Sequence, residues 1–362
     1  MFAAEQVGFI VTLTLDNFPH PTAKAHRSRG PLPLPNGWFV PAFSDELPPG
    51  GVLTRSFLGR DLVLFRTRSG VASAIDAHCP HLGAHLGHGG AVEGETLRCP
   101  FHGFCFDGRG RCVSTPRGRP PRGGARTYPL REDHGLLLVY HGPDGARPAW
   151  ELPPVDTSGW TRLLHREITL SGHPQDITEN SVDIGHFALI HGYRAVEVVR
   201  PLRIEGPYLN IRYAMQRPGG LLGFPGKRRI EFEIHVYGLG YSRVEVEVPD
   251  LGLRTHQLVL ATPTTEGQVT VRLAAATDLL GPAALPFVQA MAVRRLLSAL
   301  VARVVLHSVV HDVRQDARIW RHKVHLHRPM LAEGDRAIAL YRRWADQFYG
   351  AAGPHDEQHA SS

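Results

Sequence analysis

Apolar residues in the first half of the chain occur in short runs that are separated by turn residues. Two such runs, residues 61–66 and 71–77, lie on either side of Ser69-Gly70, and another pair flanks Asp107-Gly108. Short apolar runs joined by these dipeptides are typical of β-hairpins. The pattern therefore predicts an all-β region over residues 38–140.

The second half of the chain has a mixed pattern. Apolar residues alternate with polar ones over residues 230–236 and 244–248, which predicts two strands joined at Gly238-Leu239-Gly240. Residues 256–261 and 268–274 predict a further pair of strands. Helical spacing occurs in three segments, at residues 176–190, 285–319 and 334–348. An all-β region followed by strands and helices predicts an α+β fold.

Proline-rich residues around position 150 mark a boundary between the two regions. We expect four parts: a poorly ordered arm at residues 1–35, an all-β domain at 36–145, a mixed domain at 146–350 and a disordered tail at 351–362. The composition supports folded domains, because 43% hydrophobic and 20% charged residues are ordinary values for a globular protein.

Charge and hydropathy remove several classes of function. The formal net charge is +6, but the basic residues are scattered and are not interleaved with aromatic residues, so nucleic-acid binding is not expected. No uninterrupted apolar run reaches the roughly 18 residues of a membrane span, and the start of the chain does not resemble a secretory signal. We therefore expect a cytoplasmic protein.

All four cysteines lie within residues 79–112, which favours metal binding over a disulfide scaffold. Cys79-Pro80-His81 and Cys99-Pro100-Phe101-His102 each place a thiol and an imidazole at a turn. Two thiolates and two imidazoles suit either a zinc ion or a two-iron two-sulfur cluster with histidine on one iron. Cys105 and Cys112 lie outside these turns and are expected to be buried hairpin thiols.

The order and spacing of these ligands separate the two alternatives. A Cys-x-His pair and a Cys-x-x-His pair, with the 17 residues from Leu82 to Arg98 between them, resemble the Rieske motif. The glycines that follow His81 disfavour the helix that usually carries the histidines of a zinc finger. Ala84 and Phe101 leave no cysteines for the loop-linking disulfide of respiratory Rieske proteins, which favours the oxygenase and ferredoxin branch.

A second group of ligand residues follows about eighty residues later, in Glu179-x-x-x-Asp183-x-x-His186-x-x-x-x-His191. At helical pitch Asp183 and His186 share one face, and His191 follows where Gly192 can end the helix. The two imidazoles can therefore converge on one ion. Asp183 is close enough in sequence to orient or hydrogen-bond His186.

A distant carboxylate can complete this pair of histidines. Two histidines and one carboxylate form the facial triad that binds ferrous iron and leaves positions open for O2 and substrate. We assign the carboxylate to Asp316, late in the predicted long helix, with Asp312 as the competing candidate.

Together the two groups resemble the catalytic subunits of Rieske non-haem iron oxygenases, over about Trp38 to Tyr349. The resemblance implies a Rieske domain followed by a helix-grip-like catalytic domain with an antiparallel sheet and long C-terminal helices. Two cofactors are implied: a [2Fe-2S] cluster on Cys79, His81, Cys99 and His102, and a mononuclear Fe(II) on His186, His191 and Asp316.

The same resemblance implies how electrons reach the iron. In the family the aspartate at position 183 links the cluster of one subunit to the iron of its neighbour, which implies a homotrimer. An NAD(P)H-dependent flavin reductase would supply the electrons, directly or through a ferredoxin.

The C-terminal segment Gln315-Asp-Ala-Arg-Ile-Trp-Arg-His-Lys, followed by Arg328-Pro329, resembles the 3-ketosteroid 9α-hydroxylase and cholesterol 7-desaturase branch. This implies hydroxylation, demethylation or desaturation of a small hydrophobic substrate, a sterol or steroid. Three alternatives remain: an aromatic-ring hydroxylating or O-demethylating oxygenase, a Rieske-type electron carrier that needs only residues up to about 140, and a zinc-stabilised binding module.

Overall fold

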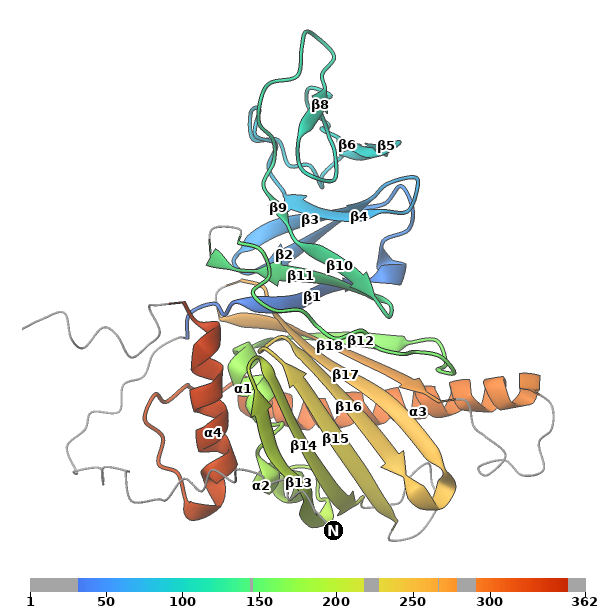
Figure 1. The fold of residues 1–362 in the computed structure, drawn as a ribbon, viewed down its shortest axis with the longest axis vertical. Coiled ribbons are helices and arrows are strands. Elements are labelled where there is room, and N and C mark those ends of the chain that lie inside the picture. The colour runs from blue at the N-terminus through green and yellow to red at the C-terminus, as the bar shows by residue number, and fades with distance from the viewer. Residues whose placement is uncertain (1–31, 144–145, 218–227, 266, 279–290, 351–362) are drawn as a thin grey trace, which may run out of the picture.

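The protein is built as a small all-β unit on the end of a large sheet that is covered by helices on one face (Figure 1). The computed structural model describes residues 32–143, 146–217, 228–265, 267–278 and 291–350. The predicted α+β class is confirmed. Most of the predicted N-terminal arm, the start of the predicted long helix at 285–290 and the predicted tail lie outside the described residues.

Three small antiparallel sheets form the all-β unit. Their strands, in spatial order, are β1 (Gly37–Phe43), β11 (Leu136–His141) and β10 (Leu130–Asp133); β2 (Val52–Phe57), β3 (Arg60–Arg66), β4 (Ala72–Asp76) and β9 (Thr127–Tyr128); and β5 (Ala91–Glu93), β6 (Thr96–Arg98), β7 (Cys105–Phe106) and β8 (Cys112–Ser114). The two predicted hairpins are confirmed, as β3 with β4 and β7 with β8. A buried cluster that includes Phe39, Phe57, Leu62, Leu64 and Val139 joins the first two sheets.

A seven-stranded antiparallel sheet dominates the second unit. Its spatial order is β12 (Leu164–Ser171), β18 (Gln268–Thr277), β17 (Leu253–Pro263), β16 (Tyr241–Val248), β15 (Arg229–Tyr237), β14 (Tyr208–Gln216) and β13 (Arg194–Glu205). The predicted pairs are confirmed, as β15 with β16 and β17 with β18. Two strands of this sheet, β12 and β13, were not predicted.

Strict alternation gives this sheet two different faces. Ile230, Ile234 and Val246 are buried on the face that the helices cover, whereas their neighbours Glu231 and Glu233 lie on the opposite face. Each fully buried aliphatic side chain stabilises the fold by roughly 1.5–3 kcal/mol. The apolar face therefore fixes where the helices dock.

Four helices cover this face: α1 (Pro174–Glu179), α2 (Ile184–Leu189), α3 (Met291–Trp320) and α4 (Arg336–Ala345). The prediction of one helix over residues 176–190 was wrong, because α1 and α2 are separate. Asp183 adopts an extended conformation and its carboxylate accepts hydrogen bonds from the backbone N–H groups of Gly185 and His186. It therefore caps α2 instead of lying inside a helix.

The long helix α3 packs along the sheet through one buried row. Val305, Leu306, Val309 and Val313 belong to a core that includes residues of β12, β17 and β18. By length and composition α3 could also cross a membrane, but core helices pass the same test. The observed contacts show it as the central packing element of the helix-covered face.

The two units share a buried interface. The carbonyl oxygen of Val40 in β1 accepts hydrogen bonds from Thr262 Oγ1 (2.9 Å) and from Arg272 Nη1 (3.1 Å) of the large sheet. Trp38 and Phe43 pack with Leu258 and other residues of that sheet in one core. The small unit is therefore held firmly against the large one.

Candidate metal centres

Two loops at the tip of the all-β unit have the same backbone turn. Cys79 N–H donates to the carbonyl of Ala84 and Gly83 N–H donates to that of Cys79, at 2.8 and 2.9 Å. The second loop repeats this pattern with Cys99, Phe104 and Gly103, at 2.8 and 3.1 Å. Each cysteine thus opens a turn that closes on a glycine four residues later.

These glycines are required by the turn. Gly83 and Gly103 have φ values of 77° and 66°, in the left-handed region that glycine adopts without strain. A methyl group at Gly103 would also meet Cγ of Pro116 at 2.9 Å. The sequence pattern of Cys, His and Gly therefore encodes the loop shape as well as the ligands.

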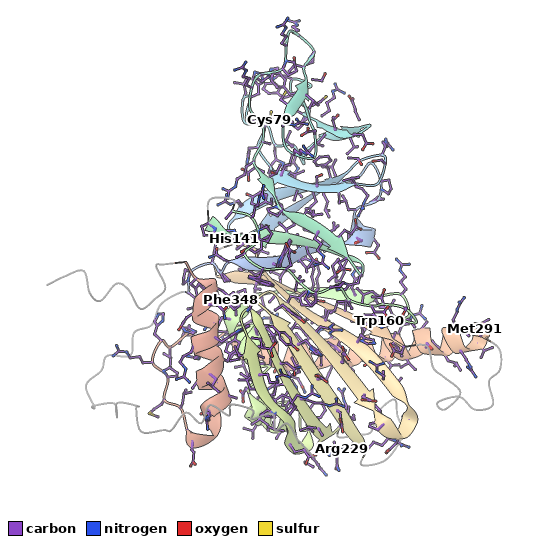
Figure 2. All side chains as sticks on the ribbon, viewed as in Figure 1. Cys79, His141, Trp160, Arg229, Met291 and Phe348 are labelled. Atoms are coloured by element: carbon purple, nitrogen blue, oxygen red, sulfur yellow. The ribbon has the colours of Figure 1, made fainter. Side chains whose placement is uncertain are left out.

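The four candidate ligands form two pairs. Cys79 and Cys99 are buried and their thiols interact, and burial raises the pKa of Cys79. His81 and His102 are exposed, with ring centroids 4.9 Å apart. The thiols thus face the protein and the imidazoles face solvent. Figure 2 labels Cys79 in the outer part of the all-β unit.

This arrangement fits a two-iron cluster better than a zinc ion. Zinc with bonds of about 2.0–2.3 Å needs four donors clustered around a single point. Among the described residues, the one group of three or more donors within 4.8 Å of one another lies elsewhere in the molecule. A Rieske cluster instead needs a thiolate pair on one iron and an imidazole pair on the other.

The remaining cysteines have structural positions. Cys105 and Cys112 are buried in β7 and β8, and their thiols face the backbone carbonyls of Gly103 and Ser114. This agrees with the prediction of buried hairpin thiols.

The group of donors that does converge is His186, His191 and Asp316. His186 lies on α2, His191 follows that helix, and Asp316 is a buried residue of α3. His191 Nε2 lies 3.3 Å from Asp316 Oδ1, and the two imidazole rings are 5.1 Å apart. Segments more than a hundred residues apart in sequence thus supply one candidate site.

The protonation of this group suits a cation. Burial lowers the pKa of His186, which keeps its imidazole neutral with a lone pair to offer. Burial alone would lower the pKa of His191, but the hydrogen bond that its imidazole donates to the Asp316 carboxylate, together with the charge of that carboxylate, raises the pKa. A metal ion that replaces the proton between His191 and Asp316 would bind the same carboxylate.

Asp183 and Asp312 have roles other than those of a ligand. The backbone carbonyl of Asp183, and not its carboxylate, accepts a hydrogen bond from His186 Nδ1. Asp312 receives a hydrogen bond from Tyr193 (3.2 Å) and one from Arg217 (3.0 Å). The structure therefore brings Asp316, and not Asp312, to the two histidines.

Sequence reasoning missed two supports of this site. Gln315 Oε1 lies 2.8 Å from His191 Nδ1. Glu179 accepts from Lys323 (2.9 Å) and Arg342 (2.6 Å), which ties α1 to the segment after α3 and to α4. Both are long-range contacts, and the only local signal was the position of Gln315 beside Asp316.

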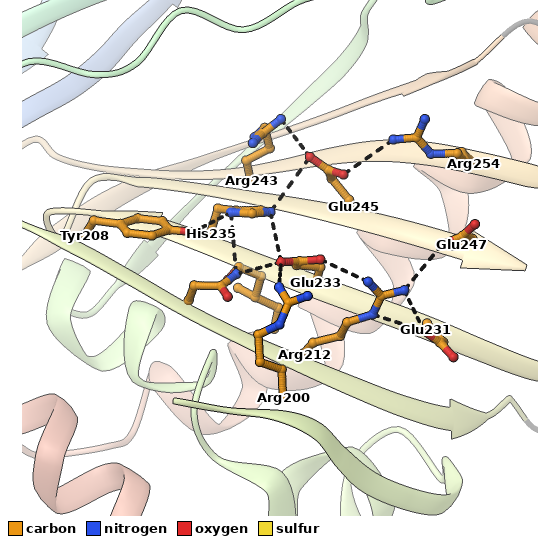
Figure 3. Close-up of polar contacts among 12 residues, drawn as sticks. Arg200, Tyr208, Arg212, Glu231, Glu233, His235, Arg243, Glu245, Glu247 and Arg254 are labelled. Carbon is orange, nitrogen blue, oxygen red and sulfur yellow. Dashed lines mark hydrogen bonds and ion pairs between the residues drawn. The ribbon is translucent and has the colours of Figure 1, made fainter. Parts of the chain in front are cut away.

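The opposite face of the sheet carries a charged network that differs in kind (Figure 3). Arg212 pairs with Glu231 and Glu233, and Glu245 with Arg243 and Arg254. All of these residues except Arg243 line a hollow of about 280 Å³, together with Glu247 and His256. Its acidic and basic lining does not suit an apolar ligand.

The small unit carries two Cys/His loops that suit a two-iron cluster, and the large unit carries a His-His-Asp group beside a helix-covered sheet. This combination defines a Rieske-type non-haem iron oxygenase. Residues 37–129 match the model of the Rieske [2Fe-2S] domain, and residues 139–349 match that of the 3-ketosteroid 9alpha-hydroxylase C-terminal domain. The chain belongs to the Rieske oxygenases whose catalytic half is of this 3-ketosteroid 9α-hydroxylase type.

Individual relatives agree with this assignment. The chain is 30% identical to a cholesterol 7-desaturase of Bombyx mori, over 90% of this chain and 73% of that protein. It is 25% identical to the oxygenase component of a 3-ketosteroid-9-alpha-monooxygenase of Rhodococcus rhodochrous, over 88% and 85% of the two chains.

Solved structures share the fold. Dicamba monooxygenase bound to dicamba superposes with a TM-score of 0.60 at 20% identity, covering 86% of this chain and 96% of that one. NdmA of Pseudomonas putida with caffeine gives 0.63 at 18%, covering 85% and 89%.

The protein is therefore an oxidoreductase, the terminal oxygenase of a system in which a separate reductase supplies electrons. Its cofactors are a [2Fe-2S] cluster and a mononuclear non-haem iron. When bound, the cluster transfers single electrons and the ferrous iron activates O2 beside a hydrophobic substrate.

Proposed function

We propose that this oxygenase hydroxylates, demethylates or desaturates a sterol or steroid. The observation that carries the proposal is the match of residues 139–349, which include the whole helix-covered sheet, to the 3-ketosteroid 9alpha-hydroxylase C-terminal domain. The relatives named for cholesterol and for a 3-ketosteroid support the same substrate class. An apolar substrate also suits the apolar side of the sheet better than its charged side.

In this proposal His186, His191 and Asp316 hold the iron, and Cys79, Cys99, His81 and His102 hold the cluster. Aromatic side chains surround the iron ligands: Phe187 lies 5.2 Å from Tyr213 and 6.3 Å from Tyr193, between ring centroids. These residues exclude water from the reacting centre and offer a surface on which a flat, apolar ring system can be positioned.

Turnover of a substrate panel with a surrogate reductase tests the substrate class. The panel contains sterols, 3-ketosteroids, a methoxybenzoate and a methylxanthine, and products are identified by mass. We expect a gain of one oxygen or a loss of two hydrogens on a sterol or steroid, with no product from His186→Ala protein. Turnover confined to the aromatic compounds would replace the proposal with the demethylating alternative.

We also propose that the chain works as a homotrimer in which Asp183 connects the cluster of one subunit with the iron of the next. The two centres of one chain lie at opposite ends of the molecule (Figure 1). Each is bordered by exposed apolar residues, Leu82 (65% exposed) and Phe101 (63%) at the cluster and Leu189 (86%) on α2. Such patches are typical of surfaces that a partner covers.

Light scattering of the purified protein tests the trimer, and a monomeric mass with full activity contradicts it. The matched kinetic test is Asp183→Asn, which keeps the cap of α2 but removes the charge. We expect cluster reduction to stay normal while electron transfer to the iron slows at least tenfold.

We also propose a redox partner, a cellular location and the limits of the two domains. We infer a flavin reductase that oxidises NAD(P)H, acting directly or through a ferredoxin, and a location in the cytoplasm, where free thiols such as Cys105 stay reduced. The domain limits 36–145 and 146–350 are supported by the gap between the last strand of the small unit and β12. Reconstitution with purified reductases, cell fractionation and limited proteolysis test these three points.

A further inference from the structure

We propose that Gln315 is a positioning residue that sets the tautomer of His191 and so presents Nε2 of that imidazole to the iron. The inference rests on the proposed assignment of His186, His191 and Asp316 as the iron ligands. It adds a residue, outside the triad, on which the formation of the site depends.

The chemistry of imidazole makes the tautomer decisive. A neutral histidine carries its proton on one ring nitrogen and a lone pair on the other, and the hydrogen bond made by one nitrogen decides which is which. Gln315 Oε1 lies 2.8 Å from His191 Nδ1. An amide oxygen only accepts, so Nδ1 carries a proton, and in the neutral imidazole that binds a metal Nε2 holds the lone pair. Nε2 is the atom that faces Asp316 Oδ1 at 3.3 Å.

The other histidine reaches the same state by a different route. His186 Nδ1 is hydrogen-bonded to the backbone carbonyl of Asp183. A backbone carbonyl is present whatever the side chain, whereas the acceptor for His191 is a single replaceable side chain. The two ligands therefore share one tautomer, but that of His191 depends on Gln315.

The position of Gln315 links the orientation of His191 to α3. Gln315 and Asp316 are adjacent on this helix, so one rigid element supplies the carboxylate ligand and also orients a ligand that follows α2. The nearby carboxylate of Asp312 is engaged by Tyr193 and Arg217. Gln315 is thus the side chain on α3 whose oxygen faces Nδ1 of His191.

Metal binding by the full-length protein tests this without turnover. The mononuclear iron is removed anaerobically with a chelator, retention of the cluster is checked by its visible spectrum, and Fe(II) and Co(II) are titrated back. We expect Gln315→Leu to weaken Fe(II) binding by about 10–100-fold, the usual effect of losing such an outer partner, and to change the Co(II) absorption spectrum. Gln315→Glu retains the acceptor oxygen and should stay within about threefold of the unmodified protein. Arg314→Leu, an exposed neighbour on the same helix, is the control and should change nothing.

Each other outcome is decisive. Unchanged Fe(II) affinity and an unchanged Co(II) spectrum in Gln315→Leu overturn the inference. Equal losses in the Leu and Glu variants, with equal falls in melting temperature, overturn it too, because they show a packing role instead of an acceptor role. His186→Ala separates the two levels: if it binds Fe(II) normally, the proposed iron site itself is wrong, whereas loss in that variant with normal binding in Gln315→Leu removes only Gln315.

Discussion

The two metal centres that we propose for this chain are built by opposite means. The cluster site consists of two short loops with the same turn, in which each cysteine lies within a few residues of its partner histidine. The iron site is assembled from α2, the segment that follows it, and α3, so its carboxylate comes from more than a hundred residues away. One centre is specified locally and the other by tertiary packing.

This difference predicts how each centre responds to amino-acid substitutions. A loop-built site depends on its ligands and on the glycines that allow the turn. A helix-built site depends also on the contacts that hold α1, α3 and α4 in place, which lie outside the site. Variants that separate these dependences test the comparison directly.

Cys99→Ser should have the largest effect, because it removes one of two thiolates from the cluster site. Serine is a poor substitute for the soft thiolate ligand, so we expect loss of the visible cluster spectrum and of essentially all turnover. The measurement is absorption together with iron and sulfide analysis. A protein that keeps its colour would show that the cysteine loops do not hold the cluster.

His186→Ala should abolish turnover but leave the cluster intact. The iron content should fall by about one iron in three, since the cluster keeps two. Visible absorption, metal analysis and product formation are measured on the same sample. Bleaching in this variant would mean that the cluster loops depend on the iron site and are not specified locally.

Local patterns predicted what is local in this molecule. The Cys-x-His and Cys-x-x-His pairs, the hairpins beside them and the alternating strands β15 and β16 follow from spacing alone. Asp183 was placed inside a helix because helical spacing does not distinguish an interior aspartate from one that caps the next helix. The strand β13 was missed because it is exposed along most of its length and shows no regular apolar alternation.

Contacts between distant segments could not be read from one sequence. The convergence of Asp316 on the histidines was a hypothesis from ligand chemistry, and the choice against Asp312 required the fold. Gln315 and the ion pairs of Glu179 leave no periodic signal, because their partners lie more than a hundred residues away.

Glu179→Gln tests the supports of the helix-built centre. Glu179 is buried and pairs with Lys323 and Arg342, so its neutralisation leaves Arg342 without a carboxylate and leaves Lys323 with Asp176 alone. We expect the free energy of unfolding to fall by about 3 kcal/mol, measured by urea denaturation at neutral pH. Glu205→Gln, which removes a pair with Arg203 that is more than 60% exposed on both sides, is the control. Similar effects in the two variants would contradict the buried role of Glu179.

Gly103→Ala tests the loop-built centre. The residue has a φ of 66°, and its new methyl group would lie 2.9 Å from Pro116, so the turn must strain or shift. We expect a loss of about 1–3 kcal/mol in the free energy of unfolding and a lower cluster content after purification. Gly334→Ala introduces a methyl group that has nothing within 4 Å and should be neutral. Full cluster content and unchanged stability in Gly103→Ala would show that the turn tolerates a side chain.

Arg98→Gln should have the smallest effect, although Arg98 is directly before Cys99. Its partner Glu93 lies 3.0 Å away, and both side chains are more than half exposed. Solvent screens such a pair, so we expect the free energy of unfolding to change by less than about 0.5 kcal/mol and the cluster spectrum to stay the same. Urea denaturation and absorption measure both. If the cluster loops are specified by their own turns, a neighbouring surface charge has no part in holding them; a loss as large as that of Gly103→Ala would show instead that the hairpin β5–β6 carries the loop.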